Sequence, residues 1–268
     1  MIEVQAATKR FGGVVAFNEV SLRVAKGSIT GLIGPNGAGK TTLFNVIAGN
    51  FKPSSGRILL DDEDVTGLES YELFHRGLLR TFQIPHEFSK LTVLENLMMV
   101  PGDQTGESLL LTWFRPRLVR DREAVVLEKA REVLEFLNFS NLANTPAGNL
   151  SGGQKKLLEL GRTMMVDARV VLLDEIGAGV NRVFLREIGD VIQRLNRDAG
   201  YTFFMIEHDL EFISRLCDPV IVMVEGEVLT EGTLHEIKAN EDVIKAYLGS
   251  RVKSRRHAPK EDSTDEIA

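Results

Sequence analysis

Gly34-Pro35-Asn36-Gly37-Ala38-Gly39-Lys40-Thr41 fits the pattern G-x-x-x-x-G-K-[ST] of a phosphate-binding loop. Its glycines let backbone N–H groups converge on phosphate oxygens without clashes from Cβ atoms. In such a loop the Lys40 ammonium reaches the β- and γ-phosphates of a nucleotide, and the Thr41 hydroxyl ligates Mg²⁺. Thr42 follows directly and joins the nucleotide-binding candidates. A chance match is the alternative, but average residue usage makes one rare in a chain of this length.

The segments on either side of this loop have the patterns that it requires. Residues 28–33 are mostly apolar and lead into a glycine, which is typical of a buried strand. Residues 40–48 have the pattern of a helix, whose N-terminus adds positive potential beside a bound phosphate. The order strand, loop, helix therefore favours a true phosphate loop over a chance match.

Two acidic residues end a second apolar run. Residues 170–173 are all Val or Leu, and Asp174 and Glu175 follow them. A buried parallel strand presents its C-terminal side chains to the ligand crevice. Asp174 is therefore a candidate to hold Mg²⁺ through water, and Glu175 is a candidate general base that polarises the attacking water. Solvated acids often end strands, so the pair gains its meaning from the phosphate loop.

The rest of the chain predicts an α/β protein with two additions. Residues 2–6 and 21–24 alternate as half-buried strands do. From 85 to 150 the pattern is helical, and Thr92 with Glu95 forms a capping box that starts a helix. Further strands are expected at residues 203–206 and 220–224, with a hairpin turn at 225–226.

Composition limits the kinds of partner. The 268 residues carry 32 basic and 38 acidic side chains, a net charge of −6, so we expect no nucleic-acid partner. The single cysteine, Cys217, excludes an intrachain disulfide and fits a reducing compartment. We expect no signal peptide, and no apolar stretch approaches the roughly 20 residues that cross a bilayer. After residue 251 the chain is charged and nearly free of apolar residues, so we expect a disordered tail. A membrane role would therefore need a partner.

Leu150-Ser151-Gly152-Gly153-Gln154 opens another predicted helix. It could be an ordinary N-cap serine with a first turn weakened by glycine. The same geometry offers free N–H groups, a hydroxyl and a helix dipole to an anion. With this segment the chain resembles the ABC ATPase family, whose signature it is. The resemblance implies that Ser151, Gly152, Gly153 and Gln154 bind the γ-phosphate of ATP held by the opposite subunit, so an active site needs two chains.

Three further residues match family positions. Phe11 stands where the family has an aromatic that stacks on adenine, although it could be an ordinary core phenylalanine. Gln83 matches the glutamine that contacts Mg²⁺ or water and leads into the helical subdomain, although a solvated glutamine is the plain alternative. His208 matches the switch histidine that contacts the γ-phosphate, although a lone histidine is usually structural. The resemblance thus implies MgATP hydrolysis with Glu175, His208 and Gln83 as catalytic residues.

The resemblance also implies the fold and its divisions. It covers roughly residues 2–250 and implies a P-loop NTPase with a RecA-like core, an N-terminal antiparallel β subdomain and an inserted helical subdomain at about 85–165. The ATPase domain would span 1–236 and a C-terminal extension 237–268. Two residues depart from the pattern of many members: Ile176 replaces a proline, and Asn181 replaces an aspartate in the loop that crosses the dimer interface.

One branch of the family is more similar than others. Residues 10–16, 80–85 with 91–96, 178–181 and 243–249 resemble the ATP-binding subunits of branched-chain amino-acid importers. The resemblance implies two membrane subunits, a solute-binding protein, and a homodimer or a heterodimer with a second ATPase. It places the chain on the cytoplasmic face of the inner membrane as a peripheral protein. Importers of urea or amides, and a lipopolysaccharide exporter, remain alternatives.

Functions without a membrane partner fit less well. ABC ATPases of translation or DNA repair commonly carry two fused halves or a long coiled-coil insertion, whereas this chain has one phosphate loop and about 65 residues of helical insertion. A pure binding module would need neither a base nor a γ-phosphate sensor. For the membrane partner we expect a docking surface beside the helical subdomain, although its apolar members could instead be core. The candidate residues are Glu87, Phe88, Leu91, Trp113 and Phe114.

Overall fold

The computed structural model describes residues 1–81, 87–101, 116–166 and 168–247. Its centre is a six-stranded sheet in the order β10-β9-β3-β8-β7-β6. The neighbours from β9 to β6 run parallel, and β10 pairs antiparallel with β9 as the hairpin prediction requires. The strands are β3 (Ile29–Ile33), β6 (Leu78–Arg80), β7 (Val170–Asp174), β8 (Thr202–Ile206), β9 (Val220–Val224) and β10 (Glu227–Gly232).

Burial explains why these strands are so apolar. Every residue of β3, β7 and β8 is buried, as parallel strands covered on both faces require. On one face lies α1 (Lys40–Ile47), whose Phe44 ring packs 4.8 Å from the ring of Phe204 in β8. On the other face lie α7 (Arg182–Ala199) and α8 (Leu210–Leu216). The carboxyl ends of the strands are thereby held rigidly for a ligand site.

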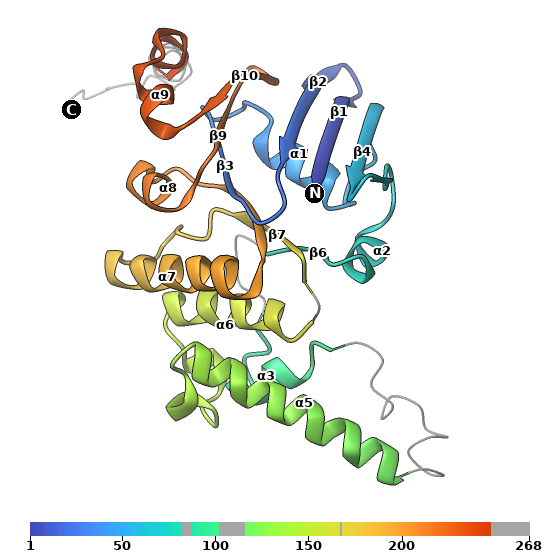
Figure 1. Ribbon diagram of the computed structural model, residues 1–268, viewed down its shortest axis with the longest axis vertical. Coiled ribbons are helices and arrows are strands. Elements are labelled where there is room, and N and C mark those ends of the chain that lie inside the picture. Colours follow the sequence, from blue (N-terminus) through green and yellow to red (C-terminus); the bar gives the residue numbers. More distant parts are fainter. Residues whose placement is uncertain (82–86, 102–115, 167, 248–268) are drawn as a thin grey trace, which may run out of the picture.

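A second sheet stands beside the first. It is antiparallel, in the order β2-β1-β4-β5, and α1 packs between it and the central sheet (Figure 1). The predicted strands at 2–6 and 21–24 are confirmed, but both extend further toward their connecting turn. The strands are β1 (Ile2–Phe11), β2 (Val14–Val24), β4 (Ser55–Leu60) and β5 (Glu63–Asp64). The sequence patterns did not predict β4, β5 or β6.

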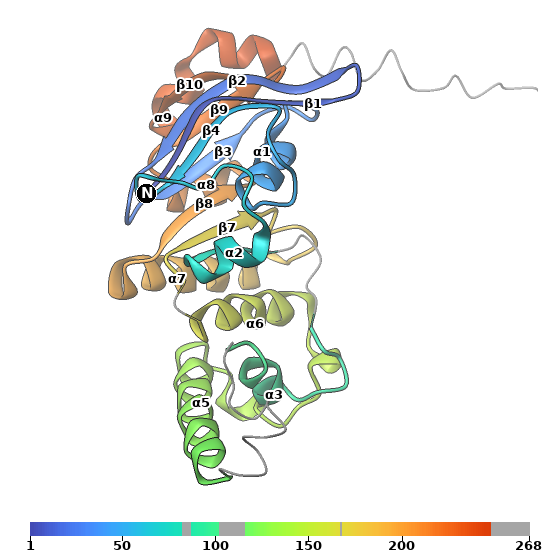
Figure 2. The same ribbon diagram turned by 90° about the vertical axis from the view of Figure 1, so that its right-hand side faces the viewer.

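Helices gather at the end of the molecule opposite this antiparallel sheet, as Figure 2 shows. The predicted capping box is present, since Thr92 Oγ1 accepts from the Glu95 N–H and Glu95 Oε2 accepts from the Thr92 N–H. Between this group and the antiparallel sheet lies the short helix α2 (Ser70–His75), which the patterns did not predict. The group consists of α3 (Val93–Met98), α5 (Pro116–Phe136) and α6 (Gly152–Met164), with short 3₁₀ turns at Ser140–Leu142 and Ala147–Asn149.

The chain ends its described part with α9 (Leu234–Ala239) and a further helical turn through residue 247. Val243 is buried, and the Tyr247 hydroxyl is hydrogen-bonded to the backbone of Gly34. Burial raises the pKa of Tyr247 despite this bond. The extension therefore packs onto the start of the phosphate loop. Across the described residues, none of the helices combines the length and apolar character that crossing a membrane would take.

Candidate active site

The phosphate loop joins β3 to α1 in the geometry that its sequence predicts. A Cβ atom on Gly34 would lie 2.0 Å from the Met223 carbonyl oxygen, and one on Gly39 would lie 2.5 Å from that of Ala16. Both glycines also have positive φ angles, 152° and 90°, which only glycine adopts readily. Gly39 caps α1 without a side-chain hydrogen bond, so the first N–H groups of the helix remain for a ligand.

Lys40 is held within this loop. Its side chain is 6% exposed, and Nζ donates to the carbonyl oxygens of Gly34 at 2.8 Å and Pro35 at 3.0 Å. Burial lowers the pKa of Lys40, while the nearby carboxylates of Glu175 and Asp174 act in the opposite direction. The ammonium is thus hydrogen-bonded to the loop and lies near enough to the two carboxylates to interact with their charge.

Asp174 and Glu175 lie at the carboxyl end of β7, as predicted. Asp174 is 4% exposed, and its Oδ2 accepts from Arg80 Nη2 at 2.6 Å. Glu175 is half-buried and has a φ angle of 50°, with its N–H donating to the Ile206 carbonyl at 2.9 Å. A non-glycine residue in this conformation is unusual, and such strain gathers at functional sites.

His208 joins this pair from the neighbouring strand. It follows β8 by two residues, and its Nε2 lies 2.9 Å from Glu175 Oε1. Glu207 beside it is buried and accepts from the Gly177 N–H at 2.8 Å. Burial raises the pKa of Glu207. The Glu207 carboxylate therefore ties the end of β8 to the turn after Glu175, a role that the sequence patterns missed.

The signature segment begins α6. Ser151 caps this helix, with Oγ accepting from the Gln154 N–H, and Gln154 Oε1 accepts from the Ser151 N–H at 2.9 Å. Gly152 is exposed, whereas Gly153 packs on Phe184 of α7. Within the described part of the chain we find no hydrogen bond between this segment and the phosphate loop. Its exposed capping serine and N–H groups can therefore face a second molecule.

Phe11 ends β1 with its ring accessible. It is 43% exposed, so it is no core residue. Its ring meets that of Phe51 edge-to-face at 5.4 Å, and Lys9 Nζ lies 4.8 Å from its centroid. Such an exposed aromatic can stack on a planar base. Phe51 belongs to the same exposed cluster and was not among the sequence candidates.

The two residues that depart from the family pattern, Asn181 and Ile176, both have structural roles. Asn181 caps α7, where its Oδ1 accepts from the N–H groups of Val183 and Phe184 at 3.0 Å each. Ile176 is buried in the core, where an apolar side chain suits the turn. Gln83 lies outside the described residues, and so do Trp113 and Phe114.

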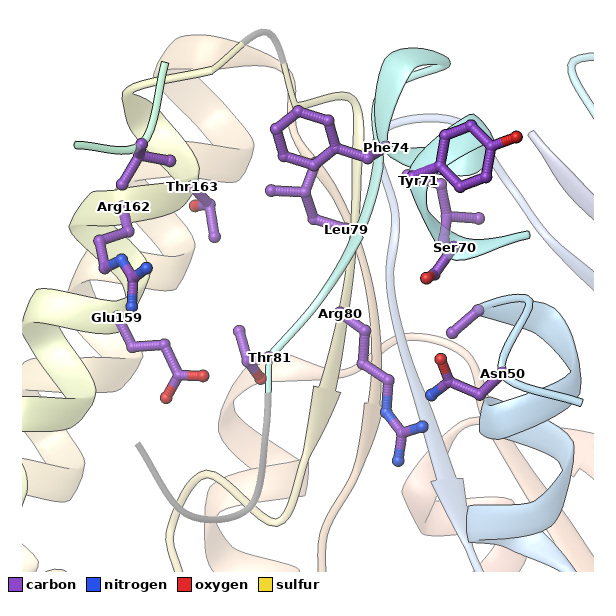
Figure 3. Close-up of a pocket in the computed structure, with 13 residues that line it drawn as sticks. Asn50, Ser70, Tyr71, Phe74, Leu79, Arg80, Thr81, Glu159, Arg162 and Thr163 are labelled. Carbon is purple, nitrogen blue, oxygen red and sulfur yellow. The ribbon is translucent and has the colours of Figure 1, made fainter. Parts of the chain in front are cut away.

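A pocket of about 460 Å³ opens beside this site, and we call it the subdomain groove. Figure 3 shows α6 forming one wall, α2 and the end of α1 the other, and β6 between them. Its apolar lining includes Tyr71 and Phe74 of α2. Arg80 of β6 and Arg162 of α6 supply charge. The groove therefore combines an apolar surface with charged groups, of which Arg80 contacts Asp174.

Comparisons with known proteins agree with this geometry. Residues 17–178 match the family described as ABC transporter, and residues 227–253 match the family described as branched-chain amino acid ATP-binding cassette transporter. The high-affinity branched-chain amino acid transport ATP-binding protein BraF of Pseudomonas aeruginosa is 38% identical over 249 residues, 93% of this chain and 98% of that protein. A probable branched-chain amino acid transport ATP-binding protein, LivG of Archaeoglobus fulgidus, is 38% identical and covers 94% of this chain and 96% of its own length.

The chain is also similar to solved structures of ATP-binding cassettes. The ADP conformation of an ATP-binding cassette of an ABC transporter has a TM-score of 0.80 and 38% identity, covering 93% of this chain and 98% of its own. A post-hydrolysis dimer of another ATP-binding cassette, bound to ADP and Pi, has a TM-score of 0.69 and 25% identity, covering 87% and 99%.

The fold and the site define a P-loop ATPase, which confirms the predicted fold class. The chain belongs to the ABC transporter family. It is the ATP-binding, ATP-hydrolysing subunit of such a transporter, as the signature segment predicted.

Proposed function

We propose that this chain powers the import of branched-chain amino acids by hydrolysing MgATP while docked on partner membrane subunits. The observation that carries the substrate class is the match of residues 227–253 to the branched-chain amino acid cassette family. The relatives named for this transport span almost the whole chain. Urea or amide import and lipopolysaccharide export remain the alternatives to be tested.

The nucleotide site divides its tasks among the candidate residues. The exposed ring of Phe11 stacks on adenine. The phosphate loop, Gly34 through Lys40 with Thr41 and Thr42, surrounds the β- and γ-phosphates with N–H groups and one ammonium. Ser151 through Gln154 of a second subunit closes over the γ-phosphate. The site is therefore complete only in a dimer, with an identical chain or a second ATPase.

Two candidate ligands of a magnesium ion lie among the described residues, Thr41 at the start of α1 and Asp174 at the end of β7, and Gln83 is a third candidate from the sequence. Thr41, Asp174 and Gln83 offer hydroxyl, carboxylate and amide oxygens, which Mg²⁺ prefers, and leave its other positions to phosphate and water. Asp174 lies close enough to the loop for its charge to act on the pKa of Lys40. When bound, the ion neutralises charge on the β- and γ-phosphate oxygens.

Hydrolysis follows from the contact between Glu175 and His208. Glu175 accepts a proton from a water whose oxygen attacks the γ-phosphorus, and the bond from that phosphorus to the β–γ bridging oxygen breaks to leave ADP. His208 lies 2.9 Å from the Glu175 carboxylate, so it can fix its orientation and contact the γ-phosphate. Gln83 would position the same water. The left-handed backbone at Glu175 sets the direction of the base.

The partner docks in the subdomain groove in this proposal. A short helix of a membrane subunit would place apolar side chains against Tyr71 and Phe74. Phe88 extends this surface, because it is 48% exposed and its ring lies 5.9 Å from Arg162 Cζ. Its exposure argues against the core alternative for Phe88. Docking would hold the chain on the cytoplasmic face of the inner membrane, with a solute-binding protein acting through the membrane subunits.

Uptake by cells lacking this chain tests the proposal. We expect loss of leucine, isoleucine and valine uptake, restored by the wild-type chain and not by Glu175→Gln. Tagged chain purified from native membranes should bring two membrane subunits with it. Normal uptake of these amino acids, with loss of urea or amide uptake or of lipopolysaccharide export, would instead select one of the alternatives.

A further inference from the structure

We propose that Arg80 is a positioning residue that links occupancy of the subdomain groove to the affinity of the active site for Mg²⁺. The proposal rests on the proposed function for the identity of the groove's occupant, a helix of the membrane subunit. Its first test needs only the isolated chain.

Strand register brings Arg80 to the magnesium carboxylate. Arg80 is the last residue of β6 and pairs with Leu172 of β7, two residues before Asp174. Its Nη2 donates to Asp174 Oδ2 at 2.6 Å, and the two side chains are only 11% and 6% exposed. A short, charge-assisted hydrogen bond shielded from water fixes the carboxylate strongly. In the part of the chain that the structure describes, we find no hydrogen bond to the second oxygen, Oδ1, which therefore remains for the metal side of the site.

The other arm of the guanidinium reaches α1. Arg80 Nη1 donates to Asn45 Oδ1 at 2.6 Å, and Asn45 Nδ2 donates to the Thr41 carbonyl at 2.8 Å. Thr41 is the candidate hydroxyl ligand of Mg²⁺. One planar guanidinium thus contacts the carboxylate of Asp174 directly and is linked through Asn45 to the backbone of Thr41, two of the candidate metal ligands. A lysine could not span both, because its ammonium is a compact point charge.

The same side chain belongs to the groove. Arg80 lines it on β6 next to Thr81, and its side chain points toward Asn50, on the side of the groove away from α6 (Figure 3). Its Nε is buried and has no hydrogen-bond partner among the described residues. Because an unsatisfied buried donor is costly, an acceptor brought into the groove would gain free energy by pairing with Nε. A helix that fills the groove and offers an acceptor would draw the guanidinium away from Asp174.

The consequence for Mg²⁺ has a definite sign. While Arg80 holds Asp174, one carboxylate is shared between two cations, and the guanidinium also repels the ion. Withdrawal of Arg80 leaves the carboxylate to the metal. Docking in the groove would therefore raise the affinity of the site for Mg²⁺, so that ATP hydrolysis is faster when the chain is bound to its membrane subunits.

The test measures Mg²⁺ dependence without turnover. ADP binding to the isolated chain is followed by calorimetry over a series of Mg²⁺ concentrations. Arg80→Met keeps the apolar stem and removes the charge, and we expect the Mg²⁺ midpoint to fall roughly tenfold, the lower range for removing a charge in direct contact. Arg162→Met is the matched control, since it removes a groove arginine from α6, and its midpoint should equal that of the wild type. An unchanged midpoint in Arg80→Met overturns the proposal.

Arg80→Lys is a conservative variant that keeps the proposal testable if Arg80→Met fails to fold. It also tests the link between the groove and Mg²⁺ affinity. It keeps a cation beside Asp174, so we expect its midpoint within roughly threefold of the wild type. In reconstituted transporters, stimulation of ATPase activity by the membrane subunits should be lost in both Arg80 variants. A shifted midpoint with wild-type stimulation would overturn the link to the groove. Failure of the wild-type transporter to import amino acids would sink the proposed function alone, because the Mg²⁺ titration of the isolated chain does not depend on it.

Discussion

His208 Nε2 lies 2.9 Å from Glu175 Oε1, so the side chains that follow two neighbouring strands, β8 and β7, meet at one point. The carboxylate is half-buried and the imidazole is exposed. This contact orients Glu175 from the side, while the turn after it is held by Glu207. Orientation by neighbours is what a general base needs if its proton transfer is to contribute to the rate.

Glu175→Gln should leave ATP binding intact and slow hydrolysis by a factor of at least ~10². The amide keeps the shape of the side chain but cannot accept the proton. It also removes a negative charge beside the γ-phosphate, so ATP should drive dimerisation that size-exclusion chromatography detects. Hydrolysis at the wild-type rate would mean that another residue is the base.

Lys40→Ala should abolish useful MgATP binding, because it removes the charge that neutralises the β- and γ-phosphates. Equilibrium binding of a fluorescent ATP analogue measures this directly. Ser151→Arg is the contrasting variant: it should bind nucleotide normally as a monomer and fail in hydrolysis. Near-normal affinity in Lys40→Ala would contradict the phosphate-loop assignment.

Mixing these two variants tests the composite site. Each mixed dimer places both lesions in one active site and leaves the other intact, so ATPase activity should return toward about a quarter of the wild-type value when pairing is random and half of the dimers are mixed. Each variant assayed alone, at the same total protein concentration, provides the baseline. No recovery, although mixed dimers form, would mean that the sites are not composite or must fire together.

Sequence patterns predicted what is local and missed what depends on distant pairing. The phosphate loop and the capping box at Thr92 are each formed by residues close together in the chain, so their sequence pattern is sufficient to predict their structure. The bonds of Arg80 to Asn45 and Asp174 span 35 and 94 positions. They follow from the register of β6, a strand of only three residues that carries no periodic signal. The left-handed backbone conformation of Glu175 likewise depends on a residue distant in the sequence, because its N–H donates to the Ile206 carbonyl of β8.

Glu207→Gln should change how stability depends on pH. Burial raises the pKa of Glu207 in the folded chain above its ordinary value of 4.5. The folded state therefore binds the proton more tightly than the unfolded state, and wild-type stability falls as pH rises from about 4.5 through the raised pKa. Glutamine can still accept from Gly177 without titrating, so thermal unfolding of the variant should lack this component. Glu231→Gln, at an exposed position on β10, is the control.

Phe88→Ala should separate docking from folding. Because Phe88 is half-exposed, we expect its truncation to cost about 1 kcal/mol or less, against the ~3–5 kcal/mol of a core phenylalanine. Co-purification with the membrane subunits should fall, while ATPase activity of the isolated chain stays normal. Val125→Ala, an exposed apolar position on α5, should change neither. A large loss of thermal stability with unchanged partner binding would return Phe88 to a purely structural role.

The two signature glycines should fail in different ways when each is changed to alanine. A Cβ on Gly153 would lie 2.5 Å from Phe184 Cγ, whereas one on Gly152 would meet no atom within 4 Å. Gly153→Ala must therefore push α6 from α7 or move the Phe184 ring, at a cost of about 1–3 kcal/mol. Gly152→Ala should leave the unfolding temperature unchanged or slightly higher, since alanine favours a helix.

ATP-dependent dimerisation then tests the role of Gly152. If its exposed backbone approaches the γ-phosphate held by a second subunit, the added methyl group blocks that approach. We expect Gly152→Ala to lose ATP-dependent dimerisation, measured in the Glu175→Gln background, while each monomer still binds ATP. Normal dimerisation would mean that Gly152 only loosens the first turn of α6, and that Ser151 and the later N–H groups carry the contact.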